Sequence, residues 1–383
     1  MAGTCDVAII GGGVIGASIA AHLGERKAGR VVVFEREDAL GAGSTAKAAG
    51  GVRLQFTTAA NVALSRYSIA ELQRFEERTG VNADLNQDGY LFLLNSDDDL
   101  AGFARTAERQ RALGAPVEVI SPGEAERILP GIRTEDLVGA TFCPEDGVAT
   151  PAALVAGYAA LARRHGVELR RECAVTEAAV LPGGGFRFTA GEEPWECGHL
   201  VNAAGPWAQE VGALLGIAVP VEPVRRQFFT TQPLGWAPRR MPLTIDWGTG
   251  VYMHWHSGGF LIGQADPDEP PGFSQTPDLD FLAGVFERAV HRLPRLEEAA
   301  MRTAAAGLYA VSPDHNAILG AVPECPRFLL ANGFSGHGMQ HAPGVGRALA
   351  EVILDGRSHT LDIEPFSLTR FGKGGAAPEG NVI

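Results

Sequence analysis

The stretch VAIIGGGVIGASIAAHL, residues 7–23, opens on four apolar residues, passes through a glycine cluster and continues in small and apolar residues. A short apolar run of this kind is typical of a buried strand in a parallel sheet. Gly11, Gly13 and Gly16 then form the pattern G-x-G-x-x-G between this strand and a predicted helix at 17–23. The pattern in this position indicates a βαβ unit that binds a dinucleotide.

Each glycine of the motif has a distinct expected role. Gly11 makes the tight turn, Gly13 lets the pyrophosphate approach the backbone, and Gly16 lets helix and strand pack closely. The N-terminus of the helix offers free N–H groups and a partial positive charge to the phosphates.

A second apolar strand is predicted at 31–34, and it ends at Glu35, 19 residues after Gly16. A carboxylate at this place can accept hydrogen bonds from the adenosine ribose. Because the acid disfavours a 2′-phosphate, NAD or FAD is expected rather than NADP.

Length and composition bound the remaining possibilities. The 383 residues suffice for two domains at roughly 100–200 residues each, and 45% apolar content is typical of a globular enzyme. A net charge of −13 argues against nucleic acid or an anionic membrane as partner. The five scattered cysteines form no C-x-x-C and predict reduced thiols. No leader or membrane-spanning pattern is evident, so we expect a cytoplasmic protein.

Periodicity and turn residues predict the other elements. Strands are expected at 90–94, 175–180, 186–189, 199–203, 224–231, 250–264 and 328–331, and helices at 59–79, 100–113, 151–165, after a cap at 276–277, and from the last glycine loop to about 354. The tail from residue 372 is rich in Gly and Ala and is expected to be disordered.

Several segments spread along the chain resemble the D-amino acid oxidase superfamily of flavoproteins, and within it sarcosine oxidase and its β subunit, glycine oxidase and dimethylglycine dehydrogenase. They are 9–17, GSTAKAAGGVR at 43–53, VNAAGPW at 201–207, GLYAVSPDHNAILG at 307–320 and NGFSGHGMQ at 332–340. The resemblance covers nearly the whole chain, and its motifs are specific for the superfamily but not for a substrate.

The resemblance implies an α/β fold in which a Rossmann-type FAD-binding domain is interleaved with an α+β substrate domain built on an antiparallel sheet. The FAD-binding domain would comprise 1–80, 145–215 and 300–365, the substrate domain 81–144 and 216–299, and a flexible tail 371–383.

The resemblance also implies a set of residues that contact FAD. They are Gly11, Gly13, Val14, Ile15, Gly16, Glu35, Arg36, Ser44, Thr45, Lys47, Ala48, Gly50, Gly51, Val175, Ala203, Gly205, Trp207, Gly307, Gly333, Ser335, Gly336, His337, Gly338, Met339 and Gln340.

Two departures from the family pattern concern the attachment of the cofactor. In dimethylglycine dehydrogenase a histidine bonds covalently to FAD, and the matching position here is Lys47; in monomeric sarcosine oxidase a cysteine does so, and the matching position is Gly307. Neither nucleophile is present, so non-covalent FAD is expected. Lys47 is interpreted either as a charge beside the flavin or as the partner of a phosphate or carboxylate.

At the substrate end the expected catalytic residues are Lys47, Arg53, Tyr309, His337 and Gln340. Arg53 matches an arginine that binds the substrate carboxylate, and its planar fork suits that group, although a structural ion pair is the alternative. Tyr309 matches a pocket tyrosine, His337 would line the flavin, and Gln340 replaces a second cationic carboxylate partner.

Two further observations concern histidines and metals. His254 and His256 flank Trp255 in a strand and should share a face, more in keeping with a structural than a catalytic role. His337 and His341 have i, i+4 spacing without an accompanying acid, so no metal site is expected.

The implied reaction is oxidation of a small amine or amino acid, with an N-methyl or secondary amino acid favoured, by hydride-equivalent transfer to the flavin and hydrolysis of the imine. Oxygen or another acceptor would reoxidise the flavin. Two alternatives stay open: oxidation of a 2-hydroxy acid, and a flavin-bearing subunit that needs a partner subunit. An NAD-dependent dehydrogenase would leave the C-terminal glycine loop without a role.

Overall fold

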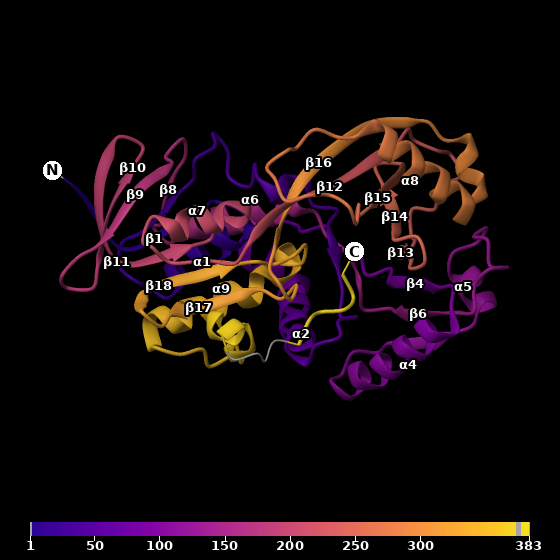
Figure 1. Cartoon of the computed structure of the whole chain (residues 1–383), viewed down its shortest axis with the longest axis horizontal. Coiled ribbons are helices and arrows are strands. Elements are labelled where there is room, and N and C mark those ends of the chain that lie inside the picture. Colours follow the sequence, from indigo (N-terminus) through magenta and orange to yellow (C-terminus); the bar gives the residue numbers. More distant parts are fainter. Residues whose placement is uncertain (1, 373–376, 383) are drawn as a thin grey trace.

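Two eight-stranded sheets lie at opposite ends of the long axis of the molecule in the computed structural model, which describes residues 2–372 and 377–382 (Figure 1). In the order β17-β18-β11-β1-β2-β8, the first sheet is parallel except at the β17 edge, and the hairpin β9-β10 pairs antiparallel with β11. Its strands are β1 (Gly3–Ile10), β2 (Val31–Phe34), β8 (Glu168–Arg170), β9 (Val175–Val180), β10 (Phe186–Ala190), β11 (Glu193–Asn202), β17 (Ile318–Val322) and β18 (Cys325–Asn332).

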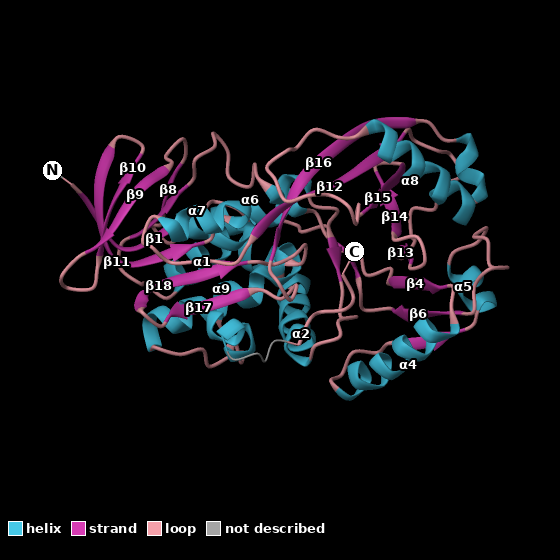
Figure 2. Ribbon diagram, in the orientation of Figure 1, coloured by secondary structure: helices cyan, strands magenta, loops and turns pink. Residues whose placement is uncertain are grey.

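Helices cover the first sheet and bury its apolar strands. Helix α1 (Val14–Glu25) is buried almost all round, from Val14 to Gly24, because α6 (Pro151–Arg164) and α9 (Gly338–Asp355) pack against it (Figure 2). A helix that is apolar on every side is stable only in such a place. The predicted strand–turn–helix–strand of the N-terminal motif is thus present.

The second sheet has the order β16-β12-β15-β14-β13-β4-β6-β5 and is antiparallel except between β13 and β4. Its strands are β4 (Tyr90–Leu94), β5 (Glu118–Ile120), β6 (Gly139–Cys143), β12 (Glu222–Thr231), β13 (Leu243–Asp246), β14 (Val251–His256), β15 (Gly259–Gln264) and β16 (Met301–Val311). Strands β3 (Gly51–Val52) and β7 (Gly147–Val148) pair with each other and form a separate small sheet. The fold class is therefore the expected α/β arrangement with a mostly antiparallel second sheet.

Helix α8 (Leu279–Arg292) packs on the second sheet through an apolar stripe that includes Leu282, Val285 and Ala289. Its N-cap is Asp278, whose carboxylate accepts from the N–H groups of Asp280 and Phe281. The prediction of a cap at 276–277 is therefore wrong by one to two residues, because the aspartate is the better N-cap acceptor.

The predicted helix at 59–79 is two helices, α2 (Ala59–Gln73) and α3 (Phe75–Thr79), with the break at Arg74. The expected stop at Gly80 is present, since this residue has a left-handed φ of 79°. The remaining helices are α4 (Asp97–Ala112), α5 (Pro122–Ile128) and α7 (Ala208–Ala213).

Two expected boundaries need correction. Strand β16 falls inside the stretch 300–365 but belongs to the second sheet, where it pairs with β12 along its whole length. The tail expected to be flexible over 371–383 is instead anchored at two side chains: Glu379 is 2% exposed and Asn381 is 5% exposed, while Ala377, Pro378 and Gly380 between and before them are exposed. The physical reason is a carboxylate that satisfies the start of α2, as described below; residues 373–376 and 383 lie outside the described residues.

The five cysteines are free thiols, as expected. Within residues 2–372 and 377–382, none of the helices has the length and apolar character required to cross a membrane.

Candidate functional site

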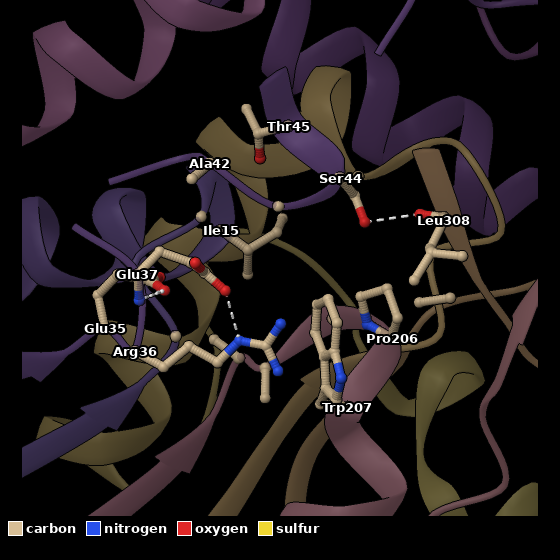
Figure 3. A pocket seen from close by; sticks show the side chains of 18 of the residues that line it. Ile15, Glu35, Arg36, Glu37, Ala42, Ser44, Thr45, Pro206, Trp207 and Leu308 are labelled. Carbon is tan, nitrogen blue, oxygen red and sulfur yellow. Dashed lines mark hydrogen bonds and ion pairs between the residues drawn. The ribbon is translucent and has the colours of Figure 1, made fainter. Parts of the chain in front are cut away.

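A cavity of about 640 Å³ runs along the carboxyl ends of β1 and β2 and reaches the second sheet at β12 and β16. The ends of parallel strands are where open α/β sheets bind ligands, and the volume lies within the range of cofactor sites. Figure 3 shows the part of the wall built around Ile15, Thr45 and Trp207. The site is described below from the glycine turn outward.

Two glycines of the first turn, Gly11 and Gly16, have no room for a side chain. Gly11 has φ +107°, and a Cβ there would lie 2.4 Å from the carbonyl oxygen of Ala203. A Cβ on Gly16 would lie 2.0 Å from the carbonyl oxygen of Gly11, so α1 packs on the turn only because this residue is glycine. Gly13 is the N-cap of α1 without a side-chain cap, and it lines the cavity. The backbone here is open to a close ligand.

Glu35 follows β2 directly and lines the cavity while remaining 9% exposed. Its two carboxylate oxygens accept from the N–H groups of Gly12, at 2.7 Å, and Glu37, at 2.9 Å. These bonds fix the orientation of the carboxylate and leave lone pairs for a hydroxyl donor. The acid is therefore held where a ribose is expected.

Three flat groups stack at the mouth of the cavity. The guanidinium carbon of Arg36 lies 3.6 Å from the centre of the Trp207 ring, and Figure 3 shows the two side by side. Phe273 stacks on Trp207 with ring centres 5.5 Å apart and planes inclined at 19°. Phe273 comes from the proline-rich loop before α8, so this loop reaches across to the nucleotide-binding half.

The small-residue loop after β2 lies along the middle of the cavity. The Thr45 hydroxyl accepts from the N–H of Val14 at 3.2 Å, which ties the loop to the start of α1. Ser44 donates to the carbonyl of Leu308 on β16 at 2.6 Å (Figure 3). Lys47 donates to the side-chain oxygen of Gln275, a neutral partner. The partner of Lys47 among the described residues is thus an amide and not a carboxylate, and its place beside the flavin or a phosphate stays a prediction.

The glycine loop after β18 closes the other end of the cavity. Ser335 has φ +49° and Gly336 has φ +98°, and a Cβ on Gly336 would lie 2.4 Å from the ring of Tyr309. Gly338, the first residue of α9, lines the cavity together with Met339. The long helix α9 therefore presents free N–H groups and a positive dipole end at this place.

Arg53 and Gln340, both buried, and the half-buried His337 form a cluster that does not line the cavity. Gln340 brackets the Arg53 backbone, accepting from its N–H at 2.9 Å and donating to its carbonyl at 3.1 Å. Arg53 donates to the carbonyls of Gln55, at 2.6 Å, and Asn381, and its guanidinium lies 3.2 Å from His337. Burial, reinforced by Arg53, lowers the pKa of His337 well below its usual value, so this imidazole is neutral.

The structure brings most of the expected cofactor residues to one cavity. Those that line it are Gly11, Gly13, Val14, Ile15, Glu35, Arg36, Ser44, Thr45, Lys47, Ala48, Val175, Ala203, Gly205, Trp207, Gly307, Ser335, Gly336, Gly338 and Met339, together with Tyr309. Those that do not line it are Gly16, Gly50, Gly51, Gly333, His337, Gln340 and Arg53. Gly51 has a packing role instead, because a Cβ there would lie 2.1 Å from the Tyr90 hydroxyl.

His254 and His256 share a face of β14, as predicted, with ring centres 6.3 Å apart. Neither lines the cavity. His254 is buried, its Nδ1 lies 2.8 Å from the Trp255 carbonyl, and burial lowers its pKa to about 4. This environment agrees with a structural role.

Sequence reasoning missed several side chains of the site, among them Arg226, Gln275 and Phe273. Arg226 and Gln275 line the cavity, and Phe273 covers Trp207. Two adjacent arginines, Arg225 and Arg226, stand inside the predicted strand 224–231, and this was a signal for Arg226. An arginine on an inward face of a sheet needs a partner. Nothing local marks Gln275 or Phe273, whose loop is placed only by the tertiary fold.

Comparison with known proteins agrees with this geometry. The chain matches the family model described as FAD dependent oxidoreductase (DAO) over residues 6–352. It is 32% identical over 426 residues to FAD-dependent oxidoreductase domain-containing protein 1 of Bos taurus, covering 99% of this chain and 87% of that protein.

Solved structures are similar over almost the whole chain. L-proline dehydrogenase from P. horikoshii matches with a TM-score of 0.91 and 31% identity, covering 98% of this chain and 100% of that one. Glycine oxidase from Geobacillus kaustophilus matches with a TM-score of 0.86 and 28% identity, covering 96% and 99%. The chain therefore belongs to the DAO family of FAD-dependent oxidoreductases. It is an enzyme of that family, with FAD as its cofactor.

Proposed function

We propose that this enzyme oxidises the C–N bond of a small amino acid to an imine, which water then hydrolyses, and that it favours a secondary or N-methyl amino acid. The observation that carries the proposal is one continuous cavity that joins the dinucleotide turn at Gly13 to Tyr309, beside the start of α9. Such a cavity holds an extended dinucleotide with its reactive ring next to a second, smaller binding space.

The residues present fit FAD. Glu35 is oriented for a ribose, Gly13 and the start of α1 offer unobstructed backbone for a pyrophosphate, and Ser335 to Gly338 surround the far end. FAD supplies the two-electron acceptor of the reaction. The chain supplies orientation and electrostatics.

We propose further that FAD is bound non-covalently. Position 307 is glycine, and Lys47 fills the space beside it, since a Cβ on Gly307 would lie 2.7 Å from the Lys47 Cβ. Neither residue offers the cysteine thiolate or imidazole that forms such bonds in the relatives named above. Tight binding would come from the many backbone contacts of the turn and the stack at Trp207.

The chain's own part in the chemistry is to orient the substrate and to shield it from water. Tyr309 is buried at the end of the cavity and its hydroxyl can donate to an oxygen of the substrate. The N-terminal end of α9 directs a positive dipole into the same space. If the amine binds in its neutral form, no general base is required, which agrees with the neutral state of His337.

The preference for a small, secondary amino acid is supported by two similar proteins, an L-proline dehydrogenase and a glycine oxidase. Proline and glycine are both small amino acids, and proline is a secondary amine. A cavity already largely committed to the dinucleotide leaves room for a substrate of that size.

The test is the visible spectrum of the purified protein before and after acid precipitation, followed by anaerobic titration with L-proline, sarcosine, glycine and D-alanine. We expect a yellow supernatant after precipitation and bleaching of the flavin band by L-proline or sarcosine. Subsequent admission of oxygen, or of a dye acceptor, then distinguishes an oxidase from a dehydrogenase by the rate at which the colour returns.

Other outcomes would contradict specific parts of the proposal. Colour retained in the pellet would contradict non-covalent binding. Bleaching by L-lactate but by none of the amines would favour 2-hydroxy acid oxidation. A yellow protein that no donor bleaches, and that becomes active only with a second chain, would favour a flavin-bearing subunit.

A further inference from the structure

Charge is unevenly distributed along the cavity. Glu35, Glu37 and Glu210 outnumber Arg36 at the nucleotide end, whereas Lys47 and Arg226 line the other end, next to Tyr309. Lys47 donates to the amide oxygen of Gln275, and neither this partner nor that of Arg226 carries a negative charge. The catalytic end of an otherwise acidic protein is thus locally positive, which favours an anionic substrate group.

Arg53, the arginine that the family resemblance assigns to the substrate carboxylate, has both of its terminal nitrogens already engaged. It is 3% exposed, and its Nη1 and Nη2 atoms donate to the carbonyls of Gln55 and Asn381. Its guanidinium also lies 4.1 Å from the centre of the Phe56 ring, which covers one of its faces. A carboxylate would have to displace these groups to reach Arg53.

Arg226 is in the opposite situation. It lines the cavity from β12, directly across from Gly307 on β16, and the Lys47 side chain packs beside that glycine. Its Nη1 atom donates to the carbonyl of Arg225 at 2.9 Å. Its Nε–H is buried and has no hydrogen-bond partner among residues 2–372 and 377–382. A buried donor without a partner is costly, and an acceptor on a ligand would remove that cost.

Tyr309 lies next to this guanidinium, whose carbon is 5.3 Å from the centre of the tyrosine ring. Burial raises the pKa of Tyr309, against the opposing influence of Arg226, so the hydroxyl keeps its proton and can donate. A planar guanidinium and a neutral hydroxyl that face one cavity can both donate hydrogen bonds to the same carboxylate.

We propose that Arg226, together with the Tyr309 hydroxyl, binds the carboxylate of the substrate, in place of Arg53. The substrate class follows: an amino acid held by its carboxylate, and not a bare amine. The inference rests on the proposed function for the identity of the reaction, but carboxylate binding by Arg226 is measurable without turnover.

The binding experiment is isothermal titration calorimetry of the FAD-loaded enzyme with tetrahydro-2-furoate, a proline analogue whose ring oxygen replaces the oxidisable amine. The neutral tetrahydro-2-furamide serves as the matched ligand without the carboxylate. We expect Arg226→Gln to weaken furoate binding by about 10- to 100-fold, as for the loss of a charge-assisted hydrogen-bond pair, and to weaken furamide binding much less, because a neutral amide gains less from the guanidinium.

Two further variants make the binding result decisive. Arg302→Gln removes the same charge from an exposed position on β16, and it is expected to bind furoate as the wild type does. Arg226→Lys keeps the charge without the planar fork and should show a smaller loss, which serves if the glutamine variant retains no FAD. Wild-type furoate affinity in both Arg226 variants would overturn the proposal.

The kinetic experiment compares L-proline with pyrrolidine, which lacks the carboxylate. Arg226→Gln should lower kcat/KM for L-proline, through a higher KM, far more than it lowers kcat/KM for pyrrolidine, so that the preference for the acid collapses. If no amine reduces the flavin, the proposed function fails, yet the furoate titration still decides the role of Arg226. An intact preference for L-proline in the variant would contradict the inference while leaving amine oxidation in place.

Discussion

The guanidinium of Arg53 donates a hydrogen bond to the backbone carbonyl of Asn381, 328 positions later in the chain. This contact holds the last described residues next to Arg53 and the start of α2. The neighbouring Glu379 directs its carboxylate at the start of α2, where it accepts from the N–H groups of Thr57 and Thr58 and from Asn61. An acid there satisfies donors that have no partner within the helix.

Replacement of Glu379 by alanine is therefore expected to lower the free energy of unfolding by about 2–4 kcal/mol, because several buried donors would lose a charged acceptor at once. Urea denaturation at fixed FAD concentration measures the change. Glu364→Ala, which removes an exposed acid, should change stability by no more than about 0.5 kcal/mol. Equal effects of the two substitutions would contradict a structural role of the C-terminal segment.

Asp146 predicts a decline of stability with rising pH. It is fully buried, and burial raises its pKa to about 7, against hydrogen bonds from the Leu54 N–H and the Gln55 amide that favour the charged form. The unfolded chain releases this proton near pH 3.9. Between about pH 4 and 7 the folded state therefore binds more protons, and this group makes unfolding easier as pH rises.

The Asp146→Asn variant removes that proton linkage. Relative to wild type, its free energy of unfolding should improve by about 2 kcal/mol between pH 5 and pH 7, at about 1.4 kcal/mol per unit. Any constant cost of the lost hydrogen bonds cancels in this comparison. Asp98→Asn, at an exposed position of α4, is the matched control, and an equal pH effect in both variants would refute the prediction.

For His22 we predict the opposite: the stability of the fold decreases as the pH falls below about 6.5. Burial in α1, with a smaller contribution from Arg78, lowers its pKa to about 4. Below about pH 6.5 the unfolded chain binds a proton that the folded chain refuses, so stability falls as the pH falls from 6.5 towards 4. His254, with a pKa lowered to about 4, acts in the same direction.

His22→Gln should therefore reduce the loss of stability between pH 7 and pH 5 by about 2 kcal/mol, measured by urea denaturation at both values. The exposed His165→Gln substitution provides the comparison. The prediction fails if the acid-induced loss is as large in His22→Gln as in the wild type.

Glu35→Gln tests the nucleotide end of the cavity. The amide keeps the size of the side chain but loses one of the two oxygens that accept from Gly12 and Glu37. We expect the dissociation constant for FAD to rise by about 10-fold, as for the loss of one charge-assisted hydrogen bond. Titration of the apoprotein with FAD, followed by flavin fluorescence, measures this, with the exposed Glu177→Gln as control. An unchanged constant would mean that the carboxylate does not contribute to the cofactor site.

Much of the nucleotide-binding half was predictable from the sequence because its determinants are local. The glycine turn, the two buried strands and Glu35 are contiguous, and sterics alone restrict Gly11 to its left-handed backbone. The break between α2 and α3 and the cap at Asp278 differ from expectation by a few residues, since helix ends depend on which side chain reaches the free N–H groups.

What the sequence by itself determined is the class of fold, the dinucleotide turn and the family, because these depend on short patterns whose spacing follows from backbone geometry. Only the tertiary structure decided which arginine faces the cavity. Arg53 and Arg226 are equally basic in the sequence, but packing ties the first to the carbonyls of Gln55 and Asn381. The Nε–H of the second has no partner in the part of the chain that the structure describes. Long-range contacts of this kind are absent from any local pattern, since they depend on which distant carbonyl the fold brings within hydrogen-bonding distance.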